Sequence, residues 1–140
     1  MKYIIKNKDG VRACVLALAE AGVFDNKVVA LVGDLGAGKT TLTQGIAAWL
    51  GVASTVQSPT YTILKSYKND HDVVCLCHID AYRADENDVL HALESCESDA
   101  LCVVEWADRV SECIPSNAQW LSIQPLKDNT RLVEIVKKRP

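Results

Sequence analysis

The segment that most constrains this fold is GDLGAGKT, which begins at Gly33 and ends at Thr40. It fills every fixed position of the phosphate-binding loop pattern G-x-x-x-x-G-K-S/T, which binds phosphate when it joins a buried strand to a helix. Both flanks have that character. The apolar run 27–32 precedes the loop, and residues 39–50 repeat apolar side chains along one helical face, with Gly51 as a cap. That apolar face is predicted to consist of Leu42, Ile46, Trp49 and Leu50. The chain is therefore predicted to bind a nucleoside triphosphate.

The loop residues have distinct expected roles. Its glycines allow consecutive backbone N–H groups to point inward, which forms an anion site at the positive end of a helix dipole. Lys39 is expected to reach the β- and γ-phosphates, and the Thr40 hydroxyl is expected to ligate Mg²⁺. The predicted nucleotide-binding residues are Asp34, Leu35, Gly36, Ala37, Gly38, Lys39, Thr40 and Thr41.

Length and charge limit the remaining possibilities. The 140 residues fit a single domain, 1–140, and leave no room for a second catalytic domain. The net charge is −3, and the five arginines are scattered, so any connection with RNA is expected to run through a partner protein. The first residues lack the apolar region of a signal peptide, and no run is long enough to span a bilayer. A cytoplasmic protein without membrane association is expected.

The six cysteines lie in apolar runs or on helical faces, which favours reduced, buried thiols over a disulfide framework. Cys75, Cys77, His78 and Asp80 raise the alternative of a metal site. However, a C-x-C pair on a strand is expected to place both sulfurs on one face, about 6.6 Å or more apart, which is too wide for shared tetrahedral zinc. A core strand is the preferred interpretation.

The rest of the chain alternates predicted strands and helices. Strands are expected at 2–6, 61–68, 73–79, 101–104, 120–124 and 131–137, with turns at 69–72 and 127–130. A first helix is expected to be capped by Asp9, to bury Val11, Cys14, Val15 and Leu18, and to end at Gly22.

A second helix is expected to open with the acidic residues 85–88 and to bury Val89, Leu90, Leu93 and Cys96, and a short helical stretch should stop before Pro115. This order of elements predicts an α/β fold: a single P-loop NTPase domain with three layers and a mixed, mostly parallel sheet that ends in an antiparallel carboxy-terminal hairpin.

Two carboxylates end apolar strands, Asp80 after residues 73–79 and Glu105 after residues 101–104. A P-loop enzyme needs a carboxylate beside the metal and a group that orients the attacking water. Glu105 and Asp80 are therefore the predicted catalytic residues, with Thr40 and Glu105 at the metal. The segment from Ser58 to Thr60 is a candidate switch that senses the γ-phosphate or Mg²⁺, although a plain turn would have a similar sequence.

Four motifs in order, residues 33–41, SPTY at 58–61, HIDAYR at 78–83 and VEW at 104–106, resemble the bacterial tRNA threonylcarbamoyladenosine biosynthesis ATPase family, TsaE. The resemblance covers nearly the whole chain. It implies a Mg²⁺-dependent ATPase that supports threonylcarbamoyl modification of the adenosine next to the anticodon. The implied partners are the tRNA threonylcarbamoyl transferase catalytic subunit and its paralogous partner subunit, with tRNA reached through that complex.

The same resemblance assigns site residues. Lys39 and Thr40 contact phosphate and Mg²⁺, Glu105 is the Walker B-like carboxylate, and Asp80 belongs to the second acidic motif. Switch or partner contacts are expected at Ser58, Thr60, Tyr82, Arg83 and Trp106. For Trp106, simple packing is the competing interpretation, since an aromatic residue after a strand end usually packs.

Other functions remain as alternatives. A GTPase would need an N/T-K-x-D segment after the loop, and the nearest match, residues 7–10, precedes it. A small-molecule P-loop kinase would carry an arginine-bearing lid, and only Arg83 and Arg109 lie between the loop and the carboxy-terminal hairpin. A nucleotide-gated assembly module with negligible hydrolysis is a further alternative.

Overall fold

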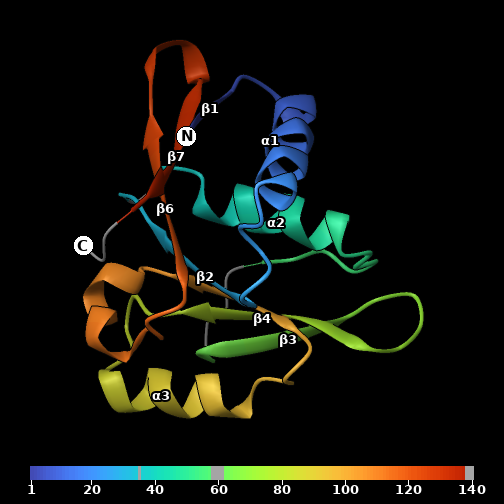
Figure 1. The fold of residues 1–140 in the computed structure, drawn as a ribbon, viewed down its shortest axis with the longest axis vertical. Helices are drawn as coiled ribbons and strands as arrows, with labels where there is room; N and C mark the ends of the chain where they lie inside the picture. The colour runs from blue at the N-terminus through green and yellow to red at the C-terminus, as the bar shows by residue number, and fades with distance from the viewer. Residues whose placement is uncertain (35, 58–61, 138–140) are drawn as a thin grey trace.

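A computed structural model describes residues 1–34, 36–57 and 62–137 (Figure 1). Within these residues one seven-stranded sheet runs through the molecule in the order β1-β7-β6-β2-β5-β4-β3. The strands are β1 Lys2–Ile5, β2 Val28–Val32, β3 Leu64–Lys68, β4 Val74–Asp80, β5 Leu101–Glu105, β6 Gln119–Pro125 and β7 Arg131–Val136. The helices are α1 Lys8–Glu20, α2 Lys39–Trp49 and α3 Glu86–Ser95, with 3-10 segments η1 Ala107–Cys113 and η2 Lys127–Asn129.

The sheet has a parallel centre and antiparallel margins. Strands β6, β2, β5 and β4 are neighbours and pair in parallel. On one side β7 pairs antiparallel with β6 and with β1, and on the other β3 pairs antiparallel with β4. The predicted mixed α/β sheet with an antiparallel carboxy-terminal hairpin is confirmed.

Helices cover both faces of this sheet, which confirms the three-layer prediction. Alternate strand residues separate into two apolar clusters: Leu31 and Val103 pack with α1 and α2, whereas Ala30 and Val104 pack with α3 and η1. Figure 1 shows α1 and α2 together on one side of the sheet and α3 on the other. No helix among the described residues is long and apolar enough to cross a membrane.

The first helix has the predicted buried face but a different cap. Asn7, and not Asp9, is the N-cap, because its backbone is extended and its side-chain oxygen accepts a hydrogen bond from the Gly10 N–H at 2.9 Å. The helix therefore starts earlier, and Asp9 lies within its first turn. In α3 the predicted acidic start is confirmed, since Asp85 and Asp88 form a reciprocal capping box.

Two predicted helical faces are partly wrong. Trp49 is 44% exposed, because it lies in the last turn of α2, where its ring meets Phe24 of the α1–β2 connection at a centroid distance of 5.1 Å. In α3, Leu90 is 42% exposed, while Val89 and Ala92 form the buried side. Tertiary surroundings, rather than helical periodicity, decide how deeply these side chains are covered.

A bulge changes the predicted geometry of the cysteine pair. Tyr67 pairs with Leu76 and the next residue pairs with Val74, which leaves Cys75 as an extra residue in β4. As a result Cys75 packs against the cluster beneath α1 and α2, whereas Cys77 belongs to the opposite cluster. The prediction that both sulfurs share one face is wrong. All six cysteines are free thiols, and the described residues contain no group of three or more metal-ligating side chains that could hold an ion.

Candidate functional site

The phosphate-binding loop connects β2 to α2, as the sequence predicts. Gly38 has a left-handed backbone (φ 106°) directly before the helix, and a Cβ there would meet the Arg131 side chain at 2.5 Å. The left-handed backbone therefore favours glycine at this position, and a Cβ there would also force the Arg131 side chain to move. Arg131 itself donates from Nε to the Ala37 carbonyl at 2.9 Å, which ties the loop to strand β7.

Lys39 is the first residue of α2 and is only 5% exposed. Its Nζ donates to the backbone carbonyls of Gly33 and Asp34, at 2.9 Å in the second case, and lies 3.9 Å from the centre of the Trp106 ring. Burial lowers the pKa of the Lys39 ammonium, and nearby carboxylates, Glu105 foremost, oppose that shift. A positive charge is therefore held at the loop by carbonyl oxygens and an aromatic face.

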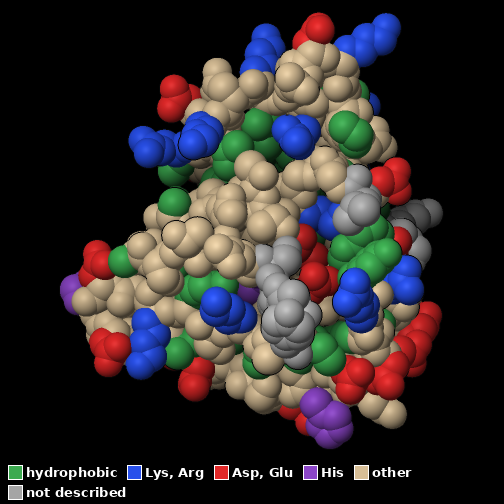
Figure 2. All heavy atoms as spheres, turned by 180° about the vertical axis from the view of Figure 1, so that it is seen from behind, with side chains coloured by type: hydrophobic (Ala, Val, Ile, Leu, Met, Phe, Trp, Pro, Cys, Tyr) green, Lys and Arg blue, Asp and Glu red, His purple; other side chains and the backbone are tan. Residues whose placement is uncertain are grey.

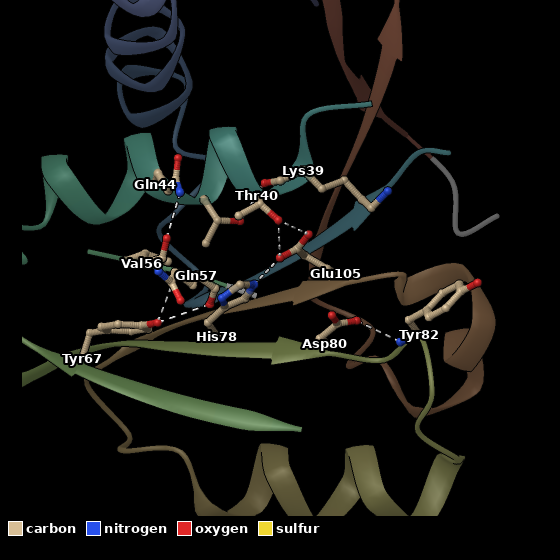
Figure 3. Close-up of polar contacts among 11 residues, drawn as sticks. Lys39, Thr40, Gln44, Val56, Gln57, Tyr67, His78, Asp80, Tyr82 and Glu105 are labelled. Carbon is tan, nitrogen blue, oxygen red and sulfur yellow. Dashed lines mark hydrogen bonds and ion pairs between the residues drawn. The ribbon is translucent and has the colours of Figure 1, made fainter. Parts of the chain in front are cut away.

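Glu105 ends β5, and the alternation of that strand points its side chain toward α2. The carboxylate is 3% exposed, and the Thr40 hydroxyl donates to it with oxygen–oxygen distances of 3.2 Å to Oε1 and 3.5 Å to Oε2. His78 Nε2 contacts Oε2 from strand β4 (Figure 3). The Walker B-like candidate thus meets the predicted metal-binding threonine directly.

Asp80 ends β4 and is the register partner of Glu105 across the parallel pair. Its Oδ1 accepts a hydrogen bond from the Tyr82 backbone N–H at 2.9 Å (Figure 3). Since His78 and Asp80 are two residues apart on one strand, both belong to the α2 side of the sheet. Two strand-end carboxylates therefore lie at the same edge, as the sequence predicts.

Trp106 follows Glu105 in a left-handed conformation (φ 59°, ψ 34°) that ends the strand abruptly. Such a conformation is uncommon for a bulky residue and is often found near functional sites. Its ring meets that of Tyr82 at a centroid distance of 4.8 Å, and the Arg109 guanidinium lies 5.2 Å from the Tyr82 ring. An aromatic wall thus borders the loop on the side of Lys39.

These groups surround a pocket of about 450 Å³. Its lining contains most of the predicted site residues: Gly36, Gly38, Lys39, Thr40, Thr41, Asp80, Tyr82, Glu105 and Trp106, together with Arg131. Asp34 contributes its carbonyl to Lys39 and Ala37 contributes its carbonyl to Arg131. Arg83 is exposed and does not line the pocket. Leu35, Ser58 and Thr60 lie outside the described residues.

Two residues of this site have no catalytic or nucleotide-binding role in the prediction: His78 is named only as an alternative metal ligand and within the HIDAYR motif, and Arg131 is not named as a site residue. His78 is fully buried against Glu105, and the signal that could have found it is its spacing of two residues from Asp80 on the same strand. Arg131 contacts Ala37 of the loop although the two residues are 94 positions apart, and no local sequence pattern predicts that contact.

The chain is similar to known proteins over most of its length. A family model described as "Threonylcarbamoyl adenosine biosynthesis protein TsaE" matches residues 5–133. A protein of Bacillus subtilis (strain 168) with the name "tRNA threonylcarbamoyladenosine biosynthesis protein TsaE" is 37% identical over 132 residues, which cover 94% of this chain and 82% of that protein. A protein of the same name from Treponema pallidum is 35% identical over 114 residues, covering 79% of this chain and 82% of the relative.

Among solved structures, the crystal structure of YdiB from Bacillus subtilis superposes with a TM-score of 0.70 at 33% sequence identity. The match covers 96% of this chain and 83% of that one. The fold and the order of its elements are therefore shared over nearly the whole length.

Proposed function

The chain belongs to the TsaE family of threonylcarbamoyl adenosine biosynthesis proteins, and from that premise we propose that it is the Mg²⁺-dependent ATP-binding and hydrolysing subunit of that pathway. Its role is to support threonylcarbamoyl modification of the adenosine next to the anticodon of tRNA. We propose that hydrolysis is slow or dependent on partner proteins, and that group transfer itself takes place elsewhere in the complex.

One observation carries this proposal: the Thr40 hydroxyl and the Glu105 carboxylate are 3.2 Å apart, in the same pocket as Lys39. A strand-end carboxylate and a P-loop threonine must converge on one metal position in a P-loop NTPase. These residues are 65 positions apart in the sequence, so the fold alone brings them together.

The donor atoms also suit the proposed ion. Hydroxyl and carboxylate oxygens are hard ligands of the kind that Mg²⁺ takes, and Mg²⁺ normally keeps several waters and phosphate oxygens besides one or two protein ligands. We propose Thr40 and Glu105 as those protein ligands. When bound, the ion would neutralise charge on the β- and γ-phosphates.

The remaining site residues are proposed to bind the phosphates and to orient the attacking water. The backbone N–H groups of loop residues 34–41 and the Lys39 ammonium are proposed to hold the phosphates, as charge-assisted hydrogen bonds are the strongest available to the chain. Asp80, whose side chain is fixed by the Tyr82 N–H, is proposed to help orient the attacking water. Ser58 and Thr60 are proposed as the γ-phosphate switch.

A second pocket of about 180 Å³ adjoins the first and shares Gly38, Thr41 and Arg131 with it. Asn7, Lys8 and Asn129 also line it. Because it is next to the start of α2, within reach of a ligand whose phosphates occupy the loop, we propose it as the nucleoside subsite. Its side-chain amides supply both donors and acceptors for a base or ribose.

The partners are proposed to be the tRNA threonylcarbamoyl transferase catalytic subunit and its paralogous partner subunit, in the cytoplasm, with tRNA bound through the complex. On the face shown in Figure 2, Lys and Arg side chains are interspersed with Asp and Glu rather than gathered in one stripe, which favours indirect contact with RNA. Tyr82 and Trp106 line the pocket and Arg83 is the exposed residue that follows Tyr82; all three are proposed as switch or partner contacts.

Phosphate release tests the proposal directly. The full chain is incubated with ATP alone, with the partner pair, and with the pair and tRNA, and copurification from native extract identifies the partners. We expect slow release alone and faster release in the complex. Transfer of phosphate to a small acceptor would identify a kinase instead, and nucleotide binding with no release under any condition would identify an assembly module.

A further inference from the structure

The contact between His78 and Glu105 is an interaction of two ionisable side chains inside the protein. His78 is 0% exposed and Glu105 is 3% exposed. Such a pair is costly to bury, and in some proteins a buried polar pair is retained because it specifies one arrangement. The opposite face of the same strands is apolar and, among the described residues, contains no such pair. The position of the His78–Glu105 pair, next to Thr40, therefore requires an explanation.

The contact uses one nitrogen of the ring. His78 Nε2 meets Glu105 Oε2, while His78 Nδ1 has no hydrogen-bond partner within the described part of the chain. An ionised carboxylate only accepts hydrogen bonds, so the Nε2–H donates. Within the described part of the chain, the His78 ring therefore makes its polar contact through Nε2, the nitrogen that faces Glu105 (Figure 3).

The two oxygens of the Glu105 carboxylate have different nearest partners. Oε2 is held by His78, and Oε1 is the oxygen nearer to the Thr40 hydroxyl, at 3.2 Å. A glutamate side chain has three rotatable bonds, so without a fixed donor behind it the carboxylate could turn away from the pocket. Lys39 does not supply that donor in this structure, as its ammonium is bound to the carbonyls of Gly33 and Asp34.

We propose that His78 is a positioning residue that fixes the Glu105 carboxylate against Thr40 through its Nε2–H. The inference rests on the proposed function, since it assigns His78 a role toward the proposed Mg²⁺ ligand. It differs from a purely structural role because it depends on a single donor atom at a defined place rather than on the volume of the ring.

Two substitutions separate these roles. In His78→Gln, the amide nitrogen is as many bonds from Cα as Nε2, and it can replace the donor. In His78→Asn, the amide nitrogen corresponds to Nδ1 and falls short of Glu105. A third variant, His78→Leu, fills the space without any donor. The melting temperature of each variant reports the structural contribution alone.

The main readout is the Mg²⁺ concentration at half-maximal binding of a fluorescent ATP analogue to the full chain. Loss of a residue that orients a metal ligand typically costs 10- to 100-fold in metal affinity or activity. We expect His78→Asn and His78→Leu to raise the Mg²⁺ midpoint at least ~10-fold, and His78→Gln to stay within about 3-fold of the wild type. In the full complex, kcat should fall in the same order with KM for ATP nearly unchanged.

The outcomes are distinct. If the wild type binds Mg²⁺-ATP but all three variants keep its Mg²⁺ midpoint, or if the midpoints follow melting temperature instead of donor position, the positioning role is wrong and the proposed function stands. If the wild type shows no Mg²⁺-dependent nucleotide binding, the proposed function fails and the role of His78 fails with it.

Discussion

The two faces of the central sheet are built from the same strands but carry different chemistry. Toward α2, strands β4 and β5 end with His78, Asp80 and Glu105. Glu105 contacts His78 and Thr40, and Asp80 and Glu105 line the same pocket as Lys39. Toward α3, the alternate residues of these strands are apolar or thiols and pack in one cluster. Adjacent residues of a strand point to opposite faces, so one residue can contribute to the site while its neighbour contributes to the apolar core.

The comparison also shows where burial is costly. Cys77, Ile79, Cys102 and Val104 on the α3 side gain free energy simply by leaving water. Lys39, His78 and Glu105 on the α2 side are buried charged or polar groups that need partners, and each has at least one. Substitutions on the two faces should therefore affect different measurements.

The largest expected effect is on hydrolysis, from Glu105→Gln. The amide keeps the size of the side chain but removes the charge proposed to organise metal and water, so we expect release of phosphate by the full complex to fall ~100-fold or more. Nucleotide affinity, measured by equilibrium titration, should remain within a few-fold of the wild type. Normal hydrolysis by this variant would make Glu105 a structural residue and remove the functional distinction between the faces.

Next in size is the loss of nucleotide affinity in Lys39→Ala. A charge-assisted hydrogen bond contributes about 1.5–3 kcal/mol, which corresponds to roughly 10- to 100-fold in Kd for labelled ATP. Its removal also takes the donor from the Gly33 and Asp34 carbonyls, so we expect the free energy of unfolding to fall by about 1–3 kcal/mol, and the titration is made well below the melting temperature. Wild-type affinity in this variant would exclude the proposed loop geometry.

The matched change on the opposite face is Val104→Ala. Val104 is fully buried beside Glu105 in sequence but packs toward α3. Its truncation should lower the free energy of unfolding by about 2 kcal/mol in urea denaturation, since it leaves a cavity in the apolar cluster. ATP affinity should stay unchanged below the melting temperature. A selective loss of ATP binding without loss of stability would show that the two faces are coupled.

The smallest expected effect is spectroscopic. Trp106 lies 3.9 Å from the Lys39 ammonium, so a bound triphosphate that attracts this ammonium should change the field at the indole. Trp49 lies beside Phe24 and Trp120 is buried in the cluster under α3, both away from the loop. We predict a nucleotide-dependent emission change in the wild type that disappears in Trp106→Phe. A signal that persists there would assign Trp106 to packing.

Several parts of the fold and site follow from local sequence because they depend on short-range patterns. The loop, its strand and helix, the strand-end carboxylates and the acidic start of α3 all coincide with residues that the pattern names. The wrong predictions concern features that depend on contacts or pairings which the local pattern does not specify. Asn7 caps α1 because its side chain reaches Gly10, and a bulge at Cys75 breaks the alternation on which the cysteine prediction depends.

The sequence by itself thus determined a P-loop between strand and helix, the residues that end β4 and β5, and the family to which they point. Three contacts were decided only by the tertiary structure. His78 contacts Glu105, Arg131 donates to the Ala37 carbonyl, and the Lys39 ammonium lies over the Trp106 ring. The physical reason is range. Periodicity and capping act within one or two turns of chain, whereas these contacts require a particular strand order and register, which form from packing and hydrogen bonds between distant segments.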